Sequence, residues 1–364
     1  LLSLVAPSFL ITSSTVQADM LLLVFWLAAV WLTVEGMDSN RPPLLWLAGL
    51  AGAAAAMTKY FGIALVPLLA AYVALRSRRP RTAGNRQNAP SIGSGSPRRM
   101  HAWALALPLV ALAAWSVYSK QQSGAYHPLG AAAYSLELKG EADVSLVTNA
   151  AHVLAFFGGT MLWPIFLLPL GRRLPVWLTV PAVLAVIALV WRDARLLHDP
   201  ESFQVWTWGD SAMYFAMALG GVLVLAAGAA AVVKRPDPDS WLLALWLYGT
   251  FVFCAFFNWT VSARNVLPCV LPAVLLTARW IETLDSRRFW ERWMTVSILP
   301  AAAVALMVAS ADRDFANAAR DFAQTEIRDR RENGETVYFA GHWGFQHYME
   351  REGATPLNYR FQTL

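Results

Sequence analysis

Charged side chains are scarce in this sequence. They make up 15% of the 364 residues, and 57% are hydrophobic, whereas soluble domains carry about 25% charged and roughly 45–50% apolar residues. The composition therefore excludes an ordinary soluble domain and indicates an integral membrane protein. Short segments that alternate between apolar and polar residues, the mark of a membrane β-barrel, are missing too. The membrane spans are expected to be helices.

Cysteine is scarce as well, and the chain lacks the features of a signal peptide. Cys254 and Cys269 are too few for a disulfide framework or a cysteine metal site; we expect small buried packing residues, and a bridge between them stays open. The chain opens LLSLVAPSFL, without an initiator Met, a basic n-region or a small-residue cleavage site. We therefore expect a fragment whose true N-terminus precedes Leu1.

Lysine is rare, because the chain has 4 lysines and 25 arginines. Seven of the arginines lie within residues 76–100, which contain no acidic residue. Removing these seven from the formal net charge of +5 leaves −2, so the basicity is local and predicts no nucleic-acid partner. Gly, Ser, Pro and Asn fill the rest of the stretch, as expected of a flexible loop at an anionic membrane face.

Apolar runs of about 17–25 residues, the length that a membrane helix needs, recur along residues 1–311. They predict an all-α polytopic membrane protein with about ten full spans and one partial span. The expected spans are 1–16 (partial), 19–35, 42–57, 60–75, 101–119, 148–169, 174–191, 209–233, 241–257, 265–281 and 294–310.

Residues 312–364 have the composition of a soluble segment. They predict a helix that ends at Asn333–Gly334, a strand at TVYFAG and a short amphipathic helix at HWGFQHYMEREG. We expect this to be the start of an extracytoplasmic α/β domain.

Arginine also predicts the orientation of the chain. Because cytoplasmic loops collect Lys and Arg, residues 76–100 are placed inside, and three further basic clusters then fall on the same side: 172–173, 234–235 and 279–292. The outer face receives Asp19, Lys59, the extracytoplasmic loops 120–147 and 192–208, the turn 258–264 and everything after residue 311.

Lys59 and Arg264 are thus two cations on the predicted outer face. Either one alone fits a side chain that extends to the lipid head groups. Together with Asp19 on the same side, they favour a site for a negatively charged head group. Lysine binds phosphate as a point charge, so a lipid phosphate is the expected anion.

The expected outer loop 120–147 mixes Tyr126, His127, Glu137 and Lys139. Long connections are either functional lids or plain solvated loops, and both interpretations stay open. If the loop is functional, these four residues are the candidate acceptor contacts. His127 has no second His at ligand spacing, so no metal site is predicted here.

Three stretches carry a resemblance to a known family. VAPSFLITSSTVQADMLLLVFWLAAVWL, WLAGLAGAAAAMTKYFGIALVPLL and NWTVSARNVLPCVLPAVLL resemble the GT-C glycosyltransferases of the dolichyl-phosphate-mannose-protein mannosyltransferase superfamily, whose bacterial members include the lipid A aminoarabinose transferases. The shared pattern is an Asp that opens a span, a Gly/Ala-rich span that ends in Thr-Lys, and an Arg before a Pro-rich span. The residues that match it are Asp19, Thr58, Lys59, Arg264, Pro268 and Pro272.

The resemblance covers roughly residues 1–75 and 255–276, with a weaker echo at 337–350. It implies an inverting transfer of a hexose or pentose from a polyprenyl phosphate to a lipid, glycan or protein acceptor, at the outer side of a bacterial inner membrane. Lys59 and Arg264 would bind the donor phosphate. Asp19 would orient the acceptor or pair with a cation.

Two departures from the family pattern affect the site. Asn265 stands where the family usually has Tyr, and the family's catalytic carboxylate, in the first outer loop, would lie before Leu1. The catalytic base is therefore not expected in this chain. No cofactor is predicted, and a divalent metal stays open.

Two other classes of protein share some of these features. A secondary transporter or flippase would show repeats and polar residues near the midplane, but no internal repeat is evident and the polar residues of note gather on one face. An O-antigen ligase or polymerase would share the outer cations but would concentrate its work in one large outer loop. The glycosyltransferase is preferred, while the donor sugar and the acceptor stay open.

Overall fold

The computed structural model describes residues 1–14, 17–78, 102–141, 146–174, 208–258, 260–341 and 343–357, together with 180, 183–184 and 186–188. It divides into two compact units, residues 1–302 and 303–364. Nearly all of the expected loop 192–208 and most of the expected span 174–191 lie outside the described residues, as does most of the arginine-rich stretch.

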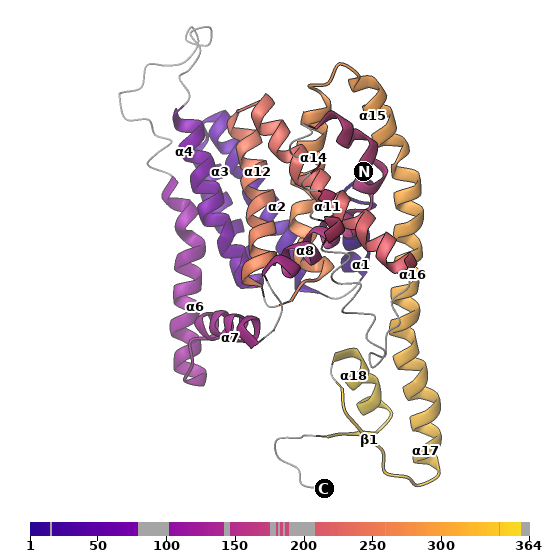
Figure 1. Ribbon diagram of the computed structural model, residues 1–364. Helices are drawn as coiled ribbons and strands as arrows, with labels where there is room; N and C mark the ends of the chain where they lie inside the picture. Colours follow the sequence, from indigo (N-terminus) through magenta and orange to yellow (C-terminus); the bar gives the residue numbers. More distant parts are fainter. Residues whose placement is uncertain are drawn as a thin grey trace. The chain divides into compact units, whose positions relative to one another are not determined.

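The first unit begins with antiparallel helices (Figure 1). Asn40 takes a left-handed conformation, with φ 57°, and the next helix starts at Pro42, so the chain reverses within three residues. It reverses again after Thr58, where Lys59 is extended, with φ −153°. These helices are α1 (Pro7–Ser14), α2 (Ala18–Ser39), α3 (Pro42–Thr58), η1 (Tyr60–Ala64) and α4 (Leu65–Arg78). The start of α2 and the end of α3 consequently lie at the same end of the bundle.

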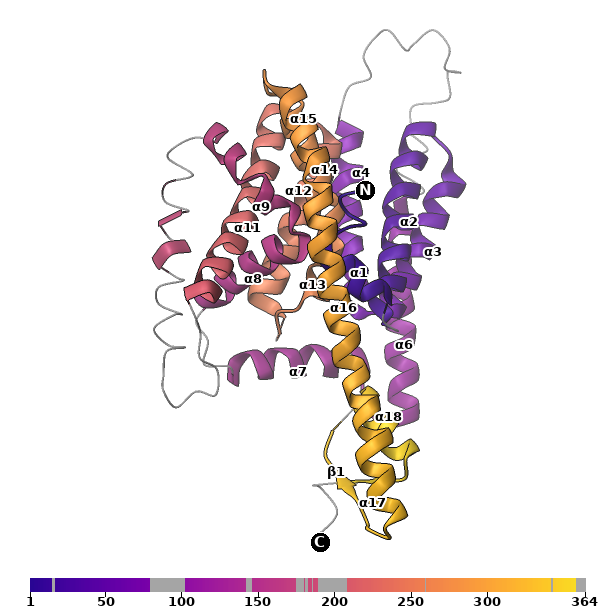
Figure 2. The same cartoon turned by 90° about the vertical axis from the view of Figure 1, so that its right-hand side faces the viewer.

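The remaining helices of this unit complete the bundle, and α7 runs across the others rather than along them (Figures 1 and 2). η5 is a π-helix. The elements are η3 (Ala102–Ala106), α6 (Leu107–Ser123), α7 (His127–Glu141), α8 (Leu146–Met161), α9 (Trp163–Phe166), η4 (Leu168–Arg173), α11 (Trp208–Lys234), α12 (Pro238–Val252), η5 (Phe253–Phe257), α13 (Ala263–Val266), η6 (Leu267–Cys269), α14 (Val270–Ile281) and α15 (Arg287–Val296).

Small residues let α8 and α11 pack with their backbones in contact. A Cβ atom on Gly158 would lie 1.8 Å from the carbonyl oxygen of Met217, and one on Gly221 would lie 2.1 Å from that of Leu154. Close approach over small residues is how membrane helices gain packing energy where lipid is as apolar as the protein. A larger side chain at either glycine would force the two helices apart.

Six helices in the described part of the chain are long and apolar enough to cross a membrane: Ala18–Ser39, Tyr60–Arg78, Trp103–Ser123, Gly209–Lys234, Pro238–Phe257 and Arg287–Glu332. Two shorter apolar helices, Pro42–Thr58 and Leu146–Met161, accompany them. The prediction of an all-helical membrane protein is confirmed. The count of about ten full spans stays a prediction.

Two of the expected spans are interrupted in the structure. In 148–169 the long helix stops at Met161, because Leu162 has a φ of 58° and a short helix then begins around Pro164. In 265–281 the chain forms three consecutive short helices, and Pro268, which has no backbone N–H to donate, lies in the middle one. Interruptions of this kind follow from backbone geometry, and hydropathy does not register them.

Ion pairs join the helices at the end of the bundle where α4 finishes. Arg76 pairs with Asp38 and lies 4.0 Å from Asp239, so α4 is connected to both α2 and α12. Arg279 Nη2 lies 2.7 Å from Asp237 Oδ2 and connects α14 to α12. The start of α2 and the end of α3 lie at the opposite end. The positive-inside rule assigns the ion-pair end to the cytoplasm, and this orientation stays a prediction.

Asp237 also caps α12 from the short connection that precedes it. Its Oδ1 atom accepts a hydrogen bond of 2.8 Å from the backbone N–H of Ser240. Burial alone would raise the pKa of Asp237, but the hydrogen bond from Ser240 and the charge of Arg279 outweigh it, and the pKa lies below its ordinary value.

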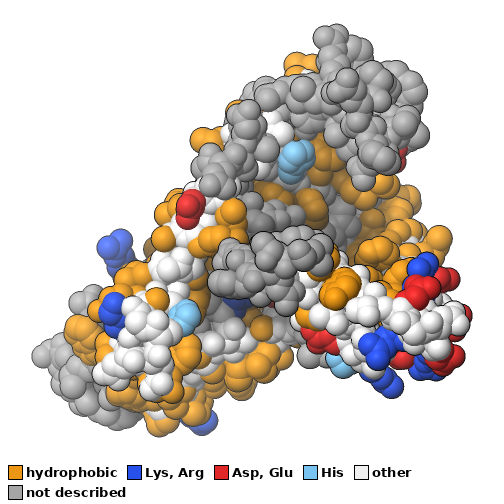
Figure 3. Space-filling model, turned by 90° about the horizontal axis from the view of Figure 1, so that it is seen from below, with side chains coloured by type: hydrophobic (Ala, Val, Ile, Leu, Met, Phe, Trp, Pro, Cys, Tyr) orange, Lys and Arg blue, Asp and Glu red, His pale blue; other side chains and the backbone are white. Residues whose placement is uncertain are grey.

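The second unit has a small core of its own, made by Ala323, Ile327, Phe339, Met349 and Ala354. Charged side chains gather on its surface in the space-filling view (Figure 3). A helical stretch ends before Gly334, whose φ is 82°, and β1 then pairs in parallel with β2. Its elements are the later part of α16 (Ile298–Phe322), η7 (Ala323–Ile327), α17 (Arg328–Glu332), β1 (Tyr338–Phe339), α18 (Trp343–Arg351) and β2 (Thr355–Pro356). That these elements open a larger α/β domain stays a prediction.

Candidate functional site

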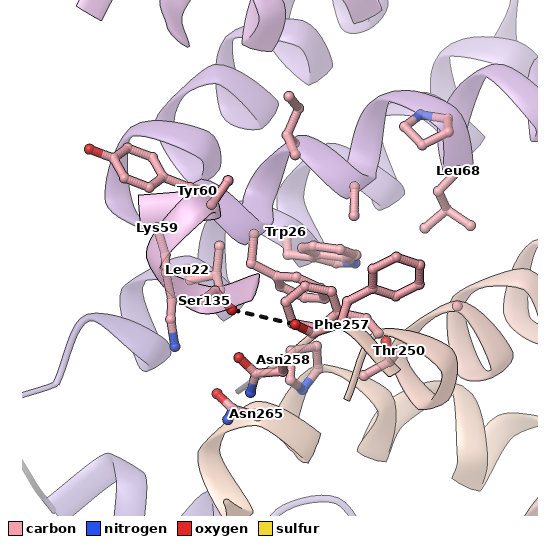
Figure 4. A pocket seen from close by; sticks show the side chains of 18 of the residues that line it. Leu22, Trp26, Lys59, Tyr60, Leu68, Ser135, Thr250, Phe257, Asn258 and Asn265 are labelled. Carbon is pink, nitrogen blue, oxygen red and sulfur yellow. Dashed lines mark hydrogen bonds between the residues drawn. The ribbon is translucent and has the colours of Figure 1, made fainter. Parts of the chain in front are cut away.

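A cavity of about 940 Å³ lies within the first unit. Its walls come from α2, η1, α4, α6, α7, α12 and the segment from η5 to η6. The charged residues that line it are Asp19, Lys59 and Arg264, the three residues that the sequence placed together. Lys59 projects on the same side as Asn258 and Asn265 (Figure 4).

Lys59 owes its position to a tight turn. Its backbone N–H still donates to Ala55 O, at 3.0 Å, and the chain then folds back through η1. Gly62 makes this fold possible, because a Cβ atom there would lie 2.4 Å from the carbonyl carbon of Ala55. The side chain of Lys59 is thereby turned towards the start of α2.

Asp19, in the first turn of α2, forms an ion pair with the Lys59 side chain. Lys59 Nζ lies 2.6 Å from Asp19 Oδ1, and the exposed fractions of the two side chains are 36% and 8%. The N-terminal end of a helix favours a negative charge, and the ammonium group neutralises it. The carboxylate is therefore satisfied inside the protein, while the lysine keeps an open side that can meet a ligand.

Arg264 supplies a second cation from α13. It is exposed to the cavity and forms no ion pair with any residue that the structure describes. Lys59 and Asp19 cancel one another, so the charged groups of the described lining leave one net positive charge. An excess of positive charge between apolar walls favours an anion.

An amide-bearing turn adjoins Arg264. Asn258 Nδ2 donates to Thr260 O at 2.5 Å, and Asn265 Nδ2 donates to the same oxygen at 3.2 Å. Asn258 directly follows the π-helix η5, a helix type that occurs frequently at functional sites. Asn265 was expected only as a departure from the family pattern, and no role in the site was predicted for Asn258.

Aromatic rings make up the deeper wall. The ring centroids of Trp26 and Phe61 are 5.3 Å apart and stacked, those of Phe61 and Phe253 are 4.6 Å apart, and those of Trp26 and Trp246 are 5.9 Å apart. Trp26 lies seven residues after Asp19 on α2, which places it about 10 Å further along the helix. The cavity is thus charged at one end and apolar beyond it.

Three of the four residues expected to contact an acceptor, His127, Glu137 and Lys139, belong to a helix rather than a loop, and Tyr126 directly precedes that helix. α7 presents Leu129, Ser135 and Leu136 to the cavity, and Ser135 Oγ donates to Phe257 O at 3.4 Å (Figure 4).

The candidate contacts themselves point elsewhere. Tyr126 lies under Lys120, with Nζ 5.2 Å from the ring centroid, and His127 Nε2 lies 3.1 Å from Ser123 Oγ. Glu137 is exposed and is not among the lining residues. The side chain of Lys139 is outside the described part of the structure.

The two cysteines are both free and buried. Cys254 Sγ donates to Asn265 O at 3.6 Å, and Cys269 Sγ donates to Val266 O at 2.9 Å. Their contacts support the turn that carries Arg264 and Asn265.

Residues 1–88 match the family of dolichyl-phosphate-mannose-protein mannosyltransferases. The matched segment contains Asp19 and Lys59 but not Arg264. This match supports membership of the GT-C superfamily and the activity of a membrane glycosyltransferase of the GT-C type. An enzyme of that type implies a lipid bilayer and a lipid-linked sugar donor. No curated protein and no solved structure matches the chain.

Proposed function

We propose that this protein is a membrane glycosyltransferase that moves a sugar from a polyprenyl phosphate to an acceptor outside the cytoplasm, with inversion at the anomeric carbon. The observation that carries the proposal is the division of one cavity into a cationic end and an apolar remainder. A polyprenyl phosphate has the same two parts, a phosphate and a hydrocarbon chain. The match of residues 1–88 supports the same class of enzyme.

The donor phosphate binds at Lys59 and Arg264 in this proposal. The cavity has one net positive charge, and a sugar phosphodiester carries one negative charge, so the complex is close to neutral. Hydrogen bonds from charged donors are roughly twice as strong as neutral ones. The two cations come from segments that are 205 positions apart in the sequence, and the phosphate would connect them.

The polyprenyl chain lies along the apolar part of the cavity. Trp26, Phe61 and Phe253 offer aromatic faces, and Leu68 of α4 and Leu112 of α6 extend the same surface. Removing hydrocarbon from water is worth about 25 cal/mol for each Å² buried, but a lipid donor comes from a bilayer that is already apolar. The walls therefore select the shape of the chain, and the cations supply most of the affinity.

The same cations assist the transfer step. When the bond between the anomeric carbon and the phosphate oxygen breaks, negative charge builds on the phosphate. Lys59 and Arg264 would stabilise it in this proposal, and groups that are preorganised for developing charge contribute strongly to catalysis. Asp19 is held by Lys59, so we assign it to positioning that lysine. The base that deprotonates the acceptor would come from another carboxylate.

A turnover assay tests the proposal. The complete protein, reconstituted with polyprenyl-phosphate sugars and membranes that supply acceptors, should convert the donor to free polyprenyl phosphate. Arg264→Ala should abolish conversion while the protein still inserts into the membrane, and Asn149→Ala, an amide change on α8 away from the lining residues, should not. Normal conversion by Arg264→Ala would contradict the donor site. Movement of an unconsumed donor across the bilayer would favour a flippase instead.

A further inference from the structure

We propose that the side chain of Asn265 binds hydroxyl groups of the sugar carried by the donor. This inference rests on the proposed function and adds a place for the sugar beside the phosphate. It is drawn from the hydrogen bonds of the turn between η5 and α13, and from the atoms of Asn265 that these bonds leave over.

Asn265 is fixed at three points. Its backbone N–H donates to Ser262 O at 3.1 Å, its backbone carbonyl accepts from Cys254 Sγ at 3.6 Å, and its Nδ2 donates to Thr260 O at 3.2 Å. A side chain held in this way loses little further conformational freedom when it binds a ligand. Asn265 is half-buried and lines the cavity, so the fixed amide faces the space in which a donor would lie.

The amide has unused capacity for hydrogen bonds. A carboxamide has two N–H donors and an oxygen that accepts; one N–H of Asn265 is occupied by Thr260 O. No described residue donates to Asn265 Oδ1. This oxygen is therefore free to accept a hydrogen bond from a ligand in the cavity.

Oδ1 and the remaining N–H of Asn265 determine which class of ligand the side chain can bind. Oδ1 is an acceptor, so it disfavours the oxygen atoms of a phosphate and favours a group that donates. A sugar hydroxyl donates and accepts, and two neighbouring hydroxyls can satisfy Oδ1 and the remaining N–H of Asn265 together. Arg264, the preceding residue, lines the same cavity and is proposed to hold the phosphate. The sugar, which is bonded directly to that phosphate, falls within reach of the amide.

Asn258 strengthens the case for a built site. Its Nδ2 donates to the same Thr260 oxygen, at 2.5 Å, and it lines the cavity as well. One carbonyl oxygen therefore gathers two amides beside the cations, on the side of the cavity where Figure 4 places Asn258, Asn265 and Lys59.

The test compares two probes, polyprenyl phosphate and polyprenyl-phosphate mannose, on the complete protein in detergent. The Kd of each is measured for the wild type, for Asn265→Ala and for Asn149→Ala as the matched control, and thermal melting is recorded for all three. Asn265→Ala should leave the Kd of polyprenyl phosphate within about twofold of the wild-type value. It should raise the Kd of polyprenyl-phosphate mannose by about three- to tenfold, the range for the loss of one neutral hydrogen bond. Asn149→Ala should change neither.

Any one of four outcomes overturns the inference. If Asn265→Ala weakens the binding of both probes equally, Asn265 only supports the turn. If it weakens the binding of neither probe, the sugar lies elsewhere. In both cases the proposed function stands. If the wild type binds neither probe, the proposed function fails as well. A measurement on the wild type alone serves if the variant does not fold. It compares polyprenyl-phosphate mannose with analogues that each lack one sugar hydroxyl, and at least one analogue should bind more weakly. Equal binding of all of them overturns the inference.

Discussion

Lys59 has two roles in the proposed site, and a pair of substitutions separates them. It neutralises Asp19, whose side chain is 8% exposed, and it meets the donor phosphate with a side chain that is 36% exposed. Lys59→Gln removes both the neutralising charge and the phosphate contact. Lys59→Gln combined with Asp19→Asn removes the phosphate contact but leaves no unpaired carboxylate.

The expected losses of phosphate affinity and of folding stability can both be estimated. A hydrogen bond from a charged group contributes about 1.5–3 kcal/mol, so the Kd of polyprenyl phosphate should rise by roughly 10- to 150-fold in either variant. Breaking a fully buried ion pair costs about 3–5 kcal/mol. Water reaches the Lys59 side of this pair, so the stability lost by Lys59→Gln should be nearer to about 1–2 kcal/mol. The double variant should recover most of that loss.

Binding of polyprenyl phosphate and thermal melting, measured on the same detergent samples, distinguish the two roles. The matched control is Lys120→Gln, since Lys120 is exposed at the end of α6 and does not line the cavity. Stability that recovers in the double variant while binding stays weak would confirm the reasoning. If the double variant binds the lipid as tightly as the wild type, Lys59 is a partner of Asp19 only and the donor site must be placed elsewhere.

Three further predictions address the turn, the ion-pair end and the orientation. Gly62→Ala should misplace the turn at Lys59, because the added Cβ would meet the α3 backbone at 2.4 Å, and the binding of polyprenyl phosphate should fall. The control is Gly124→Ala, whose added Cβ has nothing within 4 Å. It should leave binding unchanged even where the positive φ of residue 124 costs some stability. The pKa of Asp237 is lowered in the fold, so the stability that it contributes is present above about pH 4 and is lost as the pH falls through the folded-state pKa. Melting temperatures measured from pH 7 downwards should show a smaller acid loss in Asp237→Asn, and an equal loss would contradict the assignment. A cysteine placed within residues 76–100 should react with membrane-permeant thiol reagents only, and labelling of whole cells by an impermeant reagent would reverse the predicted topology.

The sequence predicted which charged residues meet, and the reason is topological. Asp19 opens one span and Lys59 closes the next, so a helical hairpin brings them to one end, and the structure places them 2.6 Å apart. Arg264 lines the same cavity. The end of the helical stretch at Asn333–Gly334 was equally readable, because glycine takes the positive φ that stops a helix.

Other parts of the site could not be predicted from this sequence. Trp26 and Phe253 are apolar residues in apolar spans, and hydropathy does not distinguish a cavity wall from a surface that faces lipid. α7 was expected as a loop, because Gly130 and scattered polar residues weaken its helical pattern. Asn258 carries no pattern of its own in the sequence, and its amide acquires significance only beside Asn265 in the folded turn.

Ion pairs join four helices at one end of the bundle, so we expect that end to act as a pivot. Arg76 joins α4 to Asp38 of α2 and to Asp239 of α12, and Arg279 joins α14 to Asp237 at the start of α12. The far portions of α2, α4 and α12 line the cavity. Lys59 joins the cavity end of α2 to the end of α3, so these two helices would tilt together. α2, with 22 residues, is about 33 Å long, and a tilt of about 5° displaces its cavity end by about 3 Å. Such tilts would let the cavity widen for a bulky lipid and narrow again without an ion pair being broken. Distances between spin labels should then change on lipid binding at the cavity end and stay constant at the pivot.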